Sequence, residues 1–173
     1  MSECPYKNYK SKVESFIKLL SKPREEFSGL PPCPFVSSEV RQQKLLIDLF
    51  DPSKENIIDK VEQLTNSSYE SLLLVQIMDG VIASEETTLY EAFINKLLKK
   101  SKYKNFKCVC FNPQDQLFAS GFNIRSHSPY FLINIADKEV LANSHDNLVK
   151  TQYYDKMDND YLKFIGIKKE DKK

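Results

Sequence analysis

The chain has 173 residues, of which 41% are hydrophobic and 28% are charged, and its 25 lysines and arginines balance 24 aspartates and glutamates. This length and composition suit a single globular domain that buries its own core. The formal net charge of +1 gives no indication of nucleic acid or an anionic membrane as a partner. No apolar run is long enough for a transmembrane helix and the N-terminus lacks a signal-peptide core, so we expect a cytoplasmic protein with reduced thiols.

The N-terminal part predicts one helix followed by a linker. Apolar residues recur at steps of three and four over residues 6–21, which indicates an amphipathic helix that ends before Pro23. Residues 22–38 are rich in proline and predict a loop that contains the sequence Leu-Pro-Pro-Cys-Pro-Phe. We therefore expect residues 1–38 to precede the core of the domain as an N-terminal helix and proline-rich linker.

Four apolar runs predict the strands of an α/β core over residues 39–167. They lie at residues 43–50, 72–78, 106–111 and 130–136. The second run is almost continuously apolar, as in a central strand that is covered on both faces. In the third run Phe106, Cys108 and Cys110 share one face, opposite Lys107, Val109 and Phe111.

Helices are expected after the first two strands. Asp51 and Pro52 are interpreted as the N-cap and the first residue of one helix. Ser84 is interpreted as the start of the next. Along that second helix three large apolar residues recur at every fourth position: Leu89, Phe93 and Leu97.

The C-terminal part predicts two further helices and a tail. Asp137 can cap a helix that runs to about Lys150. A short helix is expected at residues 161–165, and the charged residues 168–173 are expected to form a disordered tail.

The predicted fold class is α/β: a single domain with a mixed four-stranded sheet and helices on both faces, preceded by an N-terminal helix. The order β-α-β-α-β-β-α is that of a thioredoxin-like core, and its strand–helix–strand units require parallel pairs. The Cys-x-x-Cys pair expected at the start of the first core helix is replaced here by residues 51–53. Element order by itself does not define a function.

Several stretches, taken together, resemble an uncharacterised bacterial domain family of unknown function. Its Leu-Cys-Pro-Phe-Ala motif is matched by Cys33-Pro34-Phe35-Val36, and its apolar strand by the run from Ser71. Its Phe-His-Pro and Gln-Phe-Ala segments are matched by residues 111–113 and 117–119, and its Asn-Arg-Ser-Pro-Tyr-Pro motif by residues 124–130. The resemblance spans roughly residues 30–167 and implies a shared fold and a shared surface, without a reaction.

The chain departs from the motifs of that family at their polar positions. The histidine that follows the family's Phe is Asn112 here, and its later histidine falls near Ile133 or Asn134. Its Arg-Glu pair falls near Ala136 or Asp137. If the family holds a metal with its cysteine and two histidines, this chain has lost most of that set.

Cys33 is the candidate nucleophile or redox thiol. The flanking Pro32 and Pro34 restrict the backbone and favour extended geometry at Cys33. A reactive thiol needs a lowered pKa, which Arg125 or His127 can supply if the loop over residues 112–129 folds onto this segment. The alternative is that Cys33 anchors the linker to the core, because free cysteine is among the most buried residue types.

Polar residues of the long loop form the second candidate cluster. Arg125 suits a bidentate grip on a carboxylate or phosphate, and neighbouring groups can add hydrogen bonds. The predicted substrate-binding residues are Arg125, Ser126, Ser128, Tyr130 and Asn112, with His127 as a catalytic candidate beside Cys33. The alternative is a structural ion pair of Arg125, with the serines as turn residues.

Three functions remain open from the sequence. The first is an enzyme that uses Cys33 and the Arg125 loop on a small anionic substrate. The second is a non-catalytic domain that binds a small molecule or a protein. The third, a metal site built from Cys33 and His127, is the weakest because two ligands do not complete a site. The sequence predicts no particular cofactor, and Cys108 and Cys110 are interpreted as core residues.

Overall fold

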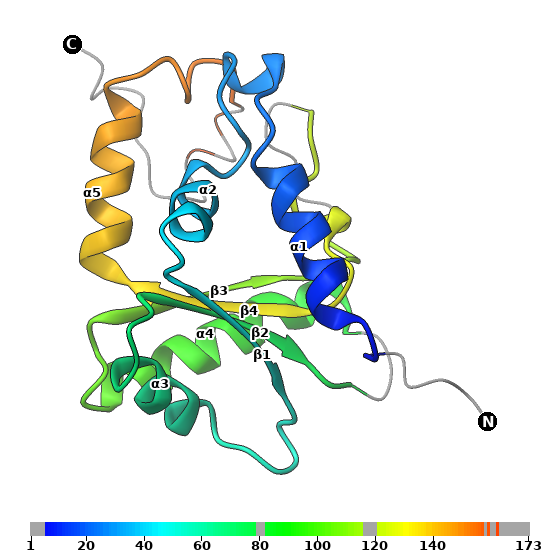
Figure 1. Ribbon diagram of the computed structural model, residues 1–173, viewed down its shortest axis with the longest axis vertical. Helices are drawn as coiled ribbons and strands as arrows, with labels where there is room; N and C mark the ends of the chain where they lie inside the picture. The colour runs from blue at the N-terminus through cyan, green and yellow to red at the C-terminus, as the bar shows by residue number, and fades with distance from the viewer. Residues whose placement is uncertain (1–5, 79–81, 116–120, 158, 160–161, 163–173) are drawn as a thin grey trace.

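The computed structural model describes residues 6–78, 82–115, 121–157, 159 and 162. A four-stranded sheet crosses the molecule, with helices on both of its faces (Figure 1). The strands are β1 (Leu45–Phe50), β2 (Ser71–Gln76), β3 (Phe106–Phe111) and β4 (Leu132–Asp137). The helices are α1 (Tyr9–Leu20), α2 (Pro34–Arg41), α3 (Ile57–Thr65), α4 (Ser84–Lys100) and α5 (Lys138–Val149). Single 3₁₀ turns lie at Glu25–Phe27 and Arg125–His127.

The strand order in the sheet is β1-β2-β4-β3. β1 and β2 are parallel, and β4 runs antiparallel to both β2 and β3. The predicted α/β class, the mixed four-stranded sheet, the element order and the N-terminal helix are confirmed. The resemblance to a thioredoxin-like core stops at the element order, because β1 is an edge strand here, whereas the first strand of that core lies inside the sheet.

Side chains that alternate along the strands build two separate cores, one on each face of the sheet. On one face Leu73, Val75 and Leu132 pack with α1 and with Tyr153 and Tyr154. On the other face Leu72, Leu74 and Ile133 pack with α3 and α4. In β3 the predicted alternation is confirmed, because Phe106, Cys108 and Cys110 are all buried in this second core. Figure 1 shows α1, α2 and α5 on the first face, and α3 and α4 on the second.

The free edge of β3 is covered by two side chains of α4. The Asn95 amide donates to the carbonyl oxygen of Cys108 at 3.0 Å, and its oxygen accepts from the N–H of the same residue at 2.9 Å. Glu91 accepts from the N–H of Cys110 at 2.8 Å. Backbone groups on an edge strand otherwise invite pairing with other chains, so these side chains protect the sheet.

The predicted start of the helix after β1 is wrong. α3 begins at Ile57, and its N-cap is Asn56, whose side chain accepts from the N–H of Ile58 at 2.9 Å. Asp51 instead caps a local turn, in which its carboxylate accepts from both the N–H and the hydroxyl of Ser53. Asp side chains favour such turns as strongly as helix starts, so the local sequence did not distinguish the two.

The predicted loop at residues 22–38 is wrong at its C-terminal end. Pro34 is the first residue of α2, and Cys33 is its N-cap with φ −134° and ψ 87°. A proline in the first helical turn needs no backbone donor, and the residue before it is forced away from helical geometry. The helix therefore crosses the predicted boundary between residues 38 and 39.

Two further expectations concern the helices after β2 and β4. α4 buries Thr87, Ile94 and Leu98, so Leu89 and Phe93 of the predicted apolar series point into solvent. The capping role of Asp137 is confirmed, since its carboxylate accepts from the N–H of Glu139 at 2.7 Å.

Most of the predicted C-terminal helix and the whole predicted tail lie outside the described residues. The helix expected at residues 161–165 lies outside the described residues except for Leu162, which is buried, and so does the tail over 168–173. Within the described residues, no helix combines the length and the apolar character needed to cross a membrane.

Candidate ligand-binding cavity

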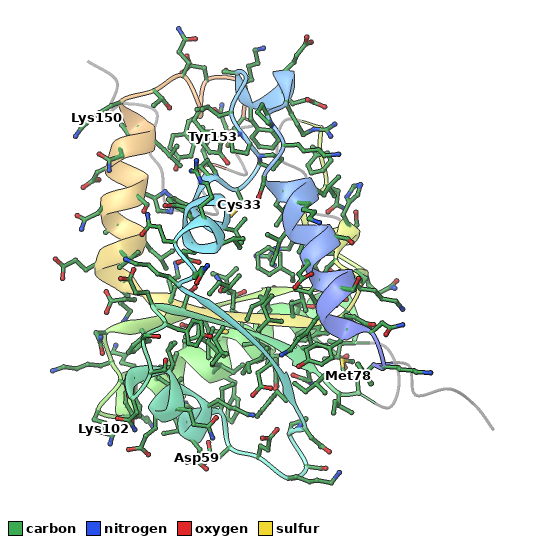
Figure 2. All side chains as sticks on the ribbon, in the orientation of Figure 1. Cys33, Asp59, Met78, Lys102, Lys150 and Tyr153 are labelled. Carbon is green, nitrogen blue, oxygen red and sulfur yellow. The ribbon has the colours of Figure 1, made fainter. Side chains whose placement is uncertain are left out.

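A cavity of about 480 Å³ lies between the sheet and α5. Its floor is formed by β3 and β4, and its walls by α5, the start of α2 and the segment that contains Tyr153 and Tyr154. Figure 2 shows Cys33 and Tyr153 on the side of the molecule that carries α2 and α5, away from Asp59 and Lys102. Ligand cavities in proteins have volumes of about 300–1,000 Å³, so this one has the size for a small molecule.

The lining of the cavity is mostly apolar, with polar side chains at a few positions. Apolar surface comes from Val109 and Phe111 of β3 and from Leu141 and Leu148 of α5. Asn134 of β4 lies directly across from Val109 in the sheet register. Asn134 is half-buried, and its side-chain amide makes no hydrogen bond with the described part of the chain. An amide in that setting is available to a ligand, because burying it without a partner is costly.

Positive charge gathers at the same end of β3 and α5. Lys107 shares the strand face of Val109 and Phe111, and both Lys107 and Lys138 line the cavity. Lys107 is exposed and has no ion-pair partner among the residues that the structure describes. The ammonium group of Lys138 donates to the carbonyl oxygen of Lys104 at 2.6 Å, which fixes its position at the first turn of α5.

His145 of α5 lines the same wall. Its Nδ1 atom shares a hydrogen bond of 2.7 Å with the hydroxyl of Tyr154, and the two rings stack at 11° between their planes. Burial lowers the pKa of His145 below its usual value, and the charge of Lys107 lowers it further, while Asp146 acts in the opposite direction. The ring is therefore neutral at pH 7 and serves as a polar wall of the cavity.

Cys33 reaches this cavity from the N-terminus of α2. Burial raises the pKa of its thiol to about 11, and the negative charge of Glu39 adds to that shift. Backbone N–H groups of Val36 and Phe35 act in the opposite direction but do not reverse it. Cys33 is thus a protonated thiol at neutral pH, whereas a nucleophilic cysteine requires a lowered pKa.

Arg125 also lines the cavity, but its charge is already paired. One guanidinium nitrogen lies 3.1 Å from the carboxylate of Asp115, and another lies 3.9 Å from that of Glu91. The side chain is 11% exposed, and that of Asp115 is buried. These contacts tie the loop to α4. Arg125 therefore forms the structural ion pair that the sequence left open as an alternative.

The other predicted site residues lie outside the cavity. His127 is exposed, stacks on Phe122 at a ring distance of 4.8 Å, and has its Nδ1 atom 2.6 Å from the carbonyl oxygen of Asn123. Ser126 also bonds to Asn123, through both its N–H and its hydroxyl. The structure therefore does not bring His127 into the cavity that Cys33 lines.

The three remaining candidates hold the loop and its neighbours together. Ser128 donates from its hydroxyl to the carbonyl oxygen of Tyr130, whose ring packs 5.5 Å from that of Tyr6. The amide of Asn112 donates to the carbonyl oxygen of Ile82 and to the hydroxyl of Thr87. Residues 116–120 of the same loop lie outside the described residues.

The sequence singled out Cys33 and Arg125 of this lining, but not its other charged or polar side chains. Those include Glu91, Lys107, Asn134, Lys138, His145 and Tyr154. The available signal was the placement of Lys107 on the same strand face as Val109 and Phe111. Asn134 was marked only through the resemblance, as one of two positions near which the later histidine of the family falls.

Cys108 and Cys110 are core residues, as the sequence indicated. Both are fully buried and free, with their sulfurs 3.8 Å apart. The described residues contain no group of three or more His, Cys, Asp or Glu side chains placed to hold a metal ion.

The chain matches no protein-family model, no curated protein and no solved structure. The resemblance in motifs therefore stays a prediction.

Proposed function

We propose that the protein is a ligand-binding domain that takes a small amphipathic anion into the cavity beneath α5. The observation that carries this proposal is an apolar cavity of about 480 Å³ that is lined by Lys107, whose charge has no ion-pair partner among the described residues, and by the side-chain amide of Asn134. An apolar body gains roughly 25 cal/mol for each Å² that it removes from water. The two polar groups on the sheet then orient an anionic head group.

An enzyme that acts on an anionic substrate is the alternative. It is favoured by the presence of Cys33 and Arg125 in the same cavity. It is opposed by the raised pKa of the Cys33 thiol and by the pairing of Arg125 with Asp115. Binding without catalysis needs neither a thiolate nor an additional cation, so it agrees better with the geometry.

We also propose a cellular compartment for the domain and a link between the cavity and the motif resemblance. We assign the domain to the cytoplasm, where the free thiols of Cys33, Cys108 and Cys110 stay reduced. Cys33 and Asn134 are two positions that the motif resemblance marks, and both line the cavity. This agreement supports the cavity as the surface that the resemblance implies.

Calorimetric titration with octanoate tests the proposal, with octanol and octylamine as neutral and cationic probes of the same chain length. We expect saturable binding of octanoate that is tighter than that of either analogue. Lys107→Gln should weaken octanoate binding about three- to tenfold, since one partly exposed charge contact is lost. Lys104→Gln is the matched control, because Lys104 is exposed and does not line the cavity.

A second pair of variants tests the location of the ligand. Ala142 and its neighbour Asn143 are both exposed on α5, but only Ala142 lines the cavity. Ala142→Trp should fill the cavity and abolish octanoate binding, while Asn143→Trp should leave it unchanged. Octanoate binding that survives Ala142→Trp, or a wild-type protein that binds none of the three probes, would refute the proposal.

A further inference from the structure

An apolar stripe on the outer side of α4 is left open to solvent. Leu89 and Phe93 are 72% and 56% exposed, and Leu97 is half-buried beside them. A spacing of four residues places the three on one side of the helix. Large exposed apolar residues that adjoin one another mark an interaction surface, whereas scattered ones do not.

The charges at the two ends of this stripe are arranged symmetrically about Phe93. Leu89 precedes Phe93 by four positions and Leu97 follows it by four. Glu86 precedes it by seven positions and Lys100 follows it by seven, and both are exposed. Seven residues are close to two helical turns, so both charged residues lie on the side of the helix that carries Phe93.

We propose that α4 pairs with α4 of a second copy of this chain, antiparallel, about a two-fold axis at Phe93. In that arrangement Leu89 of each copy meets Leu97 of the other. Glu86 of each copy then meets Lys100 of the other, which gives two equivalent ion pairs. Such self-complementarity is what a two-fold interface requires.

The charges also decide between the two possible orientations. A parallel pair places Glu86 against Glu86 and Lys100 against Lys100, and like charges in contact destabilise an interface. The antiparallel pair converts the same four groups into attractive contacts. The second copy is therefore favoured as the occupant because this helix complements itself in charge and in the spacing of its apolar residues.

The expected dimer is weak and leaves the ligand cavity open. One helix pair buries less than the roughly 1,600 Å² of a standard protein interface, so the association should depend on concentration in the micromolar range. α4 lies on the face of the sheet opposite α2 and α5 (Figure 1). Its residue Glu91 reaches the lining of the cavity, but none of the residues of the proposed interface does. Dimer formation and ligand binding are therefore separate properties.

Sedimentation equilibrium of the full chain tests the dimer. We expect the wild type to be a concentration-dependent dimer, and Glu86→Lys and Lys100→Glu each to weaken it at least about tenfold, since each turns two attractive pairs into repulsive ones. An equimolar mixture of the two variants should recover dimers of wild-type affinity, because each then faces its opposite charge. Glu85→Lys is the matched control and should dimerise as the wild type does.

The mixture also separates loss of association from loss of folding. Glu86 accepts a hydrogen bond from the N–H of Ala83, so Glu86→Lys removes a contact at the start of the helix. An unfolded variant would not regain association when mixed with its counterpart, whereas a folded one would. A wild type that stays monomeric up to millimolar concentration, or a mixture that stays monomeric, would overturn the proposal. So would dimers that persist unchanged in Phe93→Ser.

Discussion

The hydroxyl of Tyr153 donates a hydrogen bond to the carbonyl oxygen of Pro32, across 121 positions of the sequence. Both residues are buried, and both line the cavity. The ring of Tyr153 also stacks on Phe27 at a distance of 5.7 Å. This contact joins the C-terminal segment to the segment that leads into α2, and so it closes one wall of the cavity.

Tyr153→Phe should lower the free energy of unfolding by about 1–2 kcal/mol. The substitution keeps the ring in place but leaves the buried carbonyl oxygen of Pro32 without its donor. Urea denaturation measures the change. Tyr69→Phe, at a partly exposed tyrosine, is the control and should change the free energy by less than about 0.5 kcal/mol. Equal effects of the two substitutions would contradict the role given to this hydrogen bond.

Alkylation of Cys33 by iodoacetamide should be slow at pH 7–8 and should rise up to about pH 11. The pKa of this thiol is raised to about 11 by burial, so the reactive thiolate accumulates only in strongly alkaline solution. Mass spectrometry of the modified peptide gives the rate at each pH, with circular dichroism to verify that the fold persists. A rate that reaches its plateau below pH 9 would show a normal or activated thiol and would favour the enzyme.

Glu39→Gln should raise stability at pH 7 and reduce its dependence on pH. Burial raises the pKa of Glu39, although its hydrogen bond from Ser71 opposes this shift. The folded state therefore holds the proton more tightly than the unfolded state. The Glu39 carboxyl therefore contributes stability that is complete below its pKa in the unfolded state. That contribution is lost as pH rises through its pKa in the folded state.

Glutamine keeps an acceptor for the Ser71 hydroxyl without a buried charge, so we expect a gain of less than about 1 kcal/mol at pH 7. Thermal melts of both proteins between pH 4 and pH 8 measure it. Curves that stay parallel over this range would show that the ionisation of Glu39 does not affect folding.

Asn95→Ala should lower the free energy of unfolding by about 2 kcal/mol. It removes two hydrogen bonds to the backbone of Cys108 and exposes the edge of β3. Chemical denaturation measures the loss, and light scattering should detect faster aggregation. Lys96→Ala, at the next and exposed position of α4, should change the stability by less than about 0.5 kcal/mol. A variant as stable as this control would disprove the edge-covering role.

The strands were predictable because their apolar pattern survives in the final packing. In the run from Phe106 to Phe111 every second residue is buried in one core, and Phe111 on the other side packs against the other core. The start of α3 was not predictable, because Asp51 and Asn56 are both good caps and only the turn contacts of Asp51 decide between them. α2 was missed because the prolines around Cys33 indicated a loop, although Pro34 also suits a first helical residue.

The cavity could not be derived from sequence, because its polar residues come from elements that meet only in the fold. Lys107 and Asn134 lie on neighbouring antiparallel strands, and His145 lies on the helix above them. Asn134 stands inside an apolar run, where the pattern indicates only a strand. The polar loop around Arg125 was predicted as the site instead, but the guanidinium of Arg125 forms an ion pair with Asp115.

The most direct test of the ligand-binding account is a titration of the ¹⁵N-labelled protein with octanoate, followed by NMR. We expect saturable shifts of the backbone amides around the cavity, at Lys107, Val109 and Asn134 in the sheet and at Leu141 and His145 in α5. These shifts should disappear in Ala142→Trp. An absence of saturable shifts, or shifts confined to the outer side of α4, would show that octanoate does not bind in the cavity.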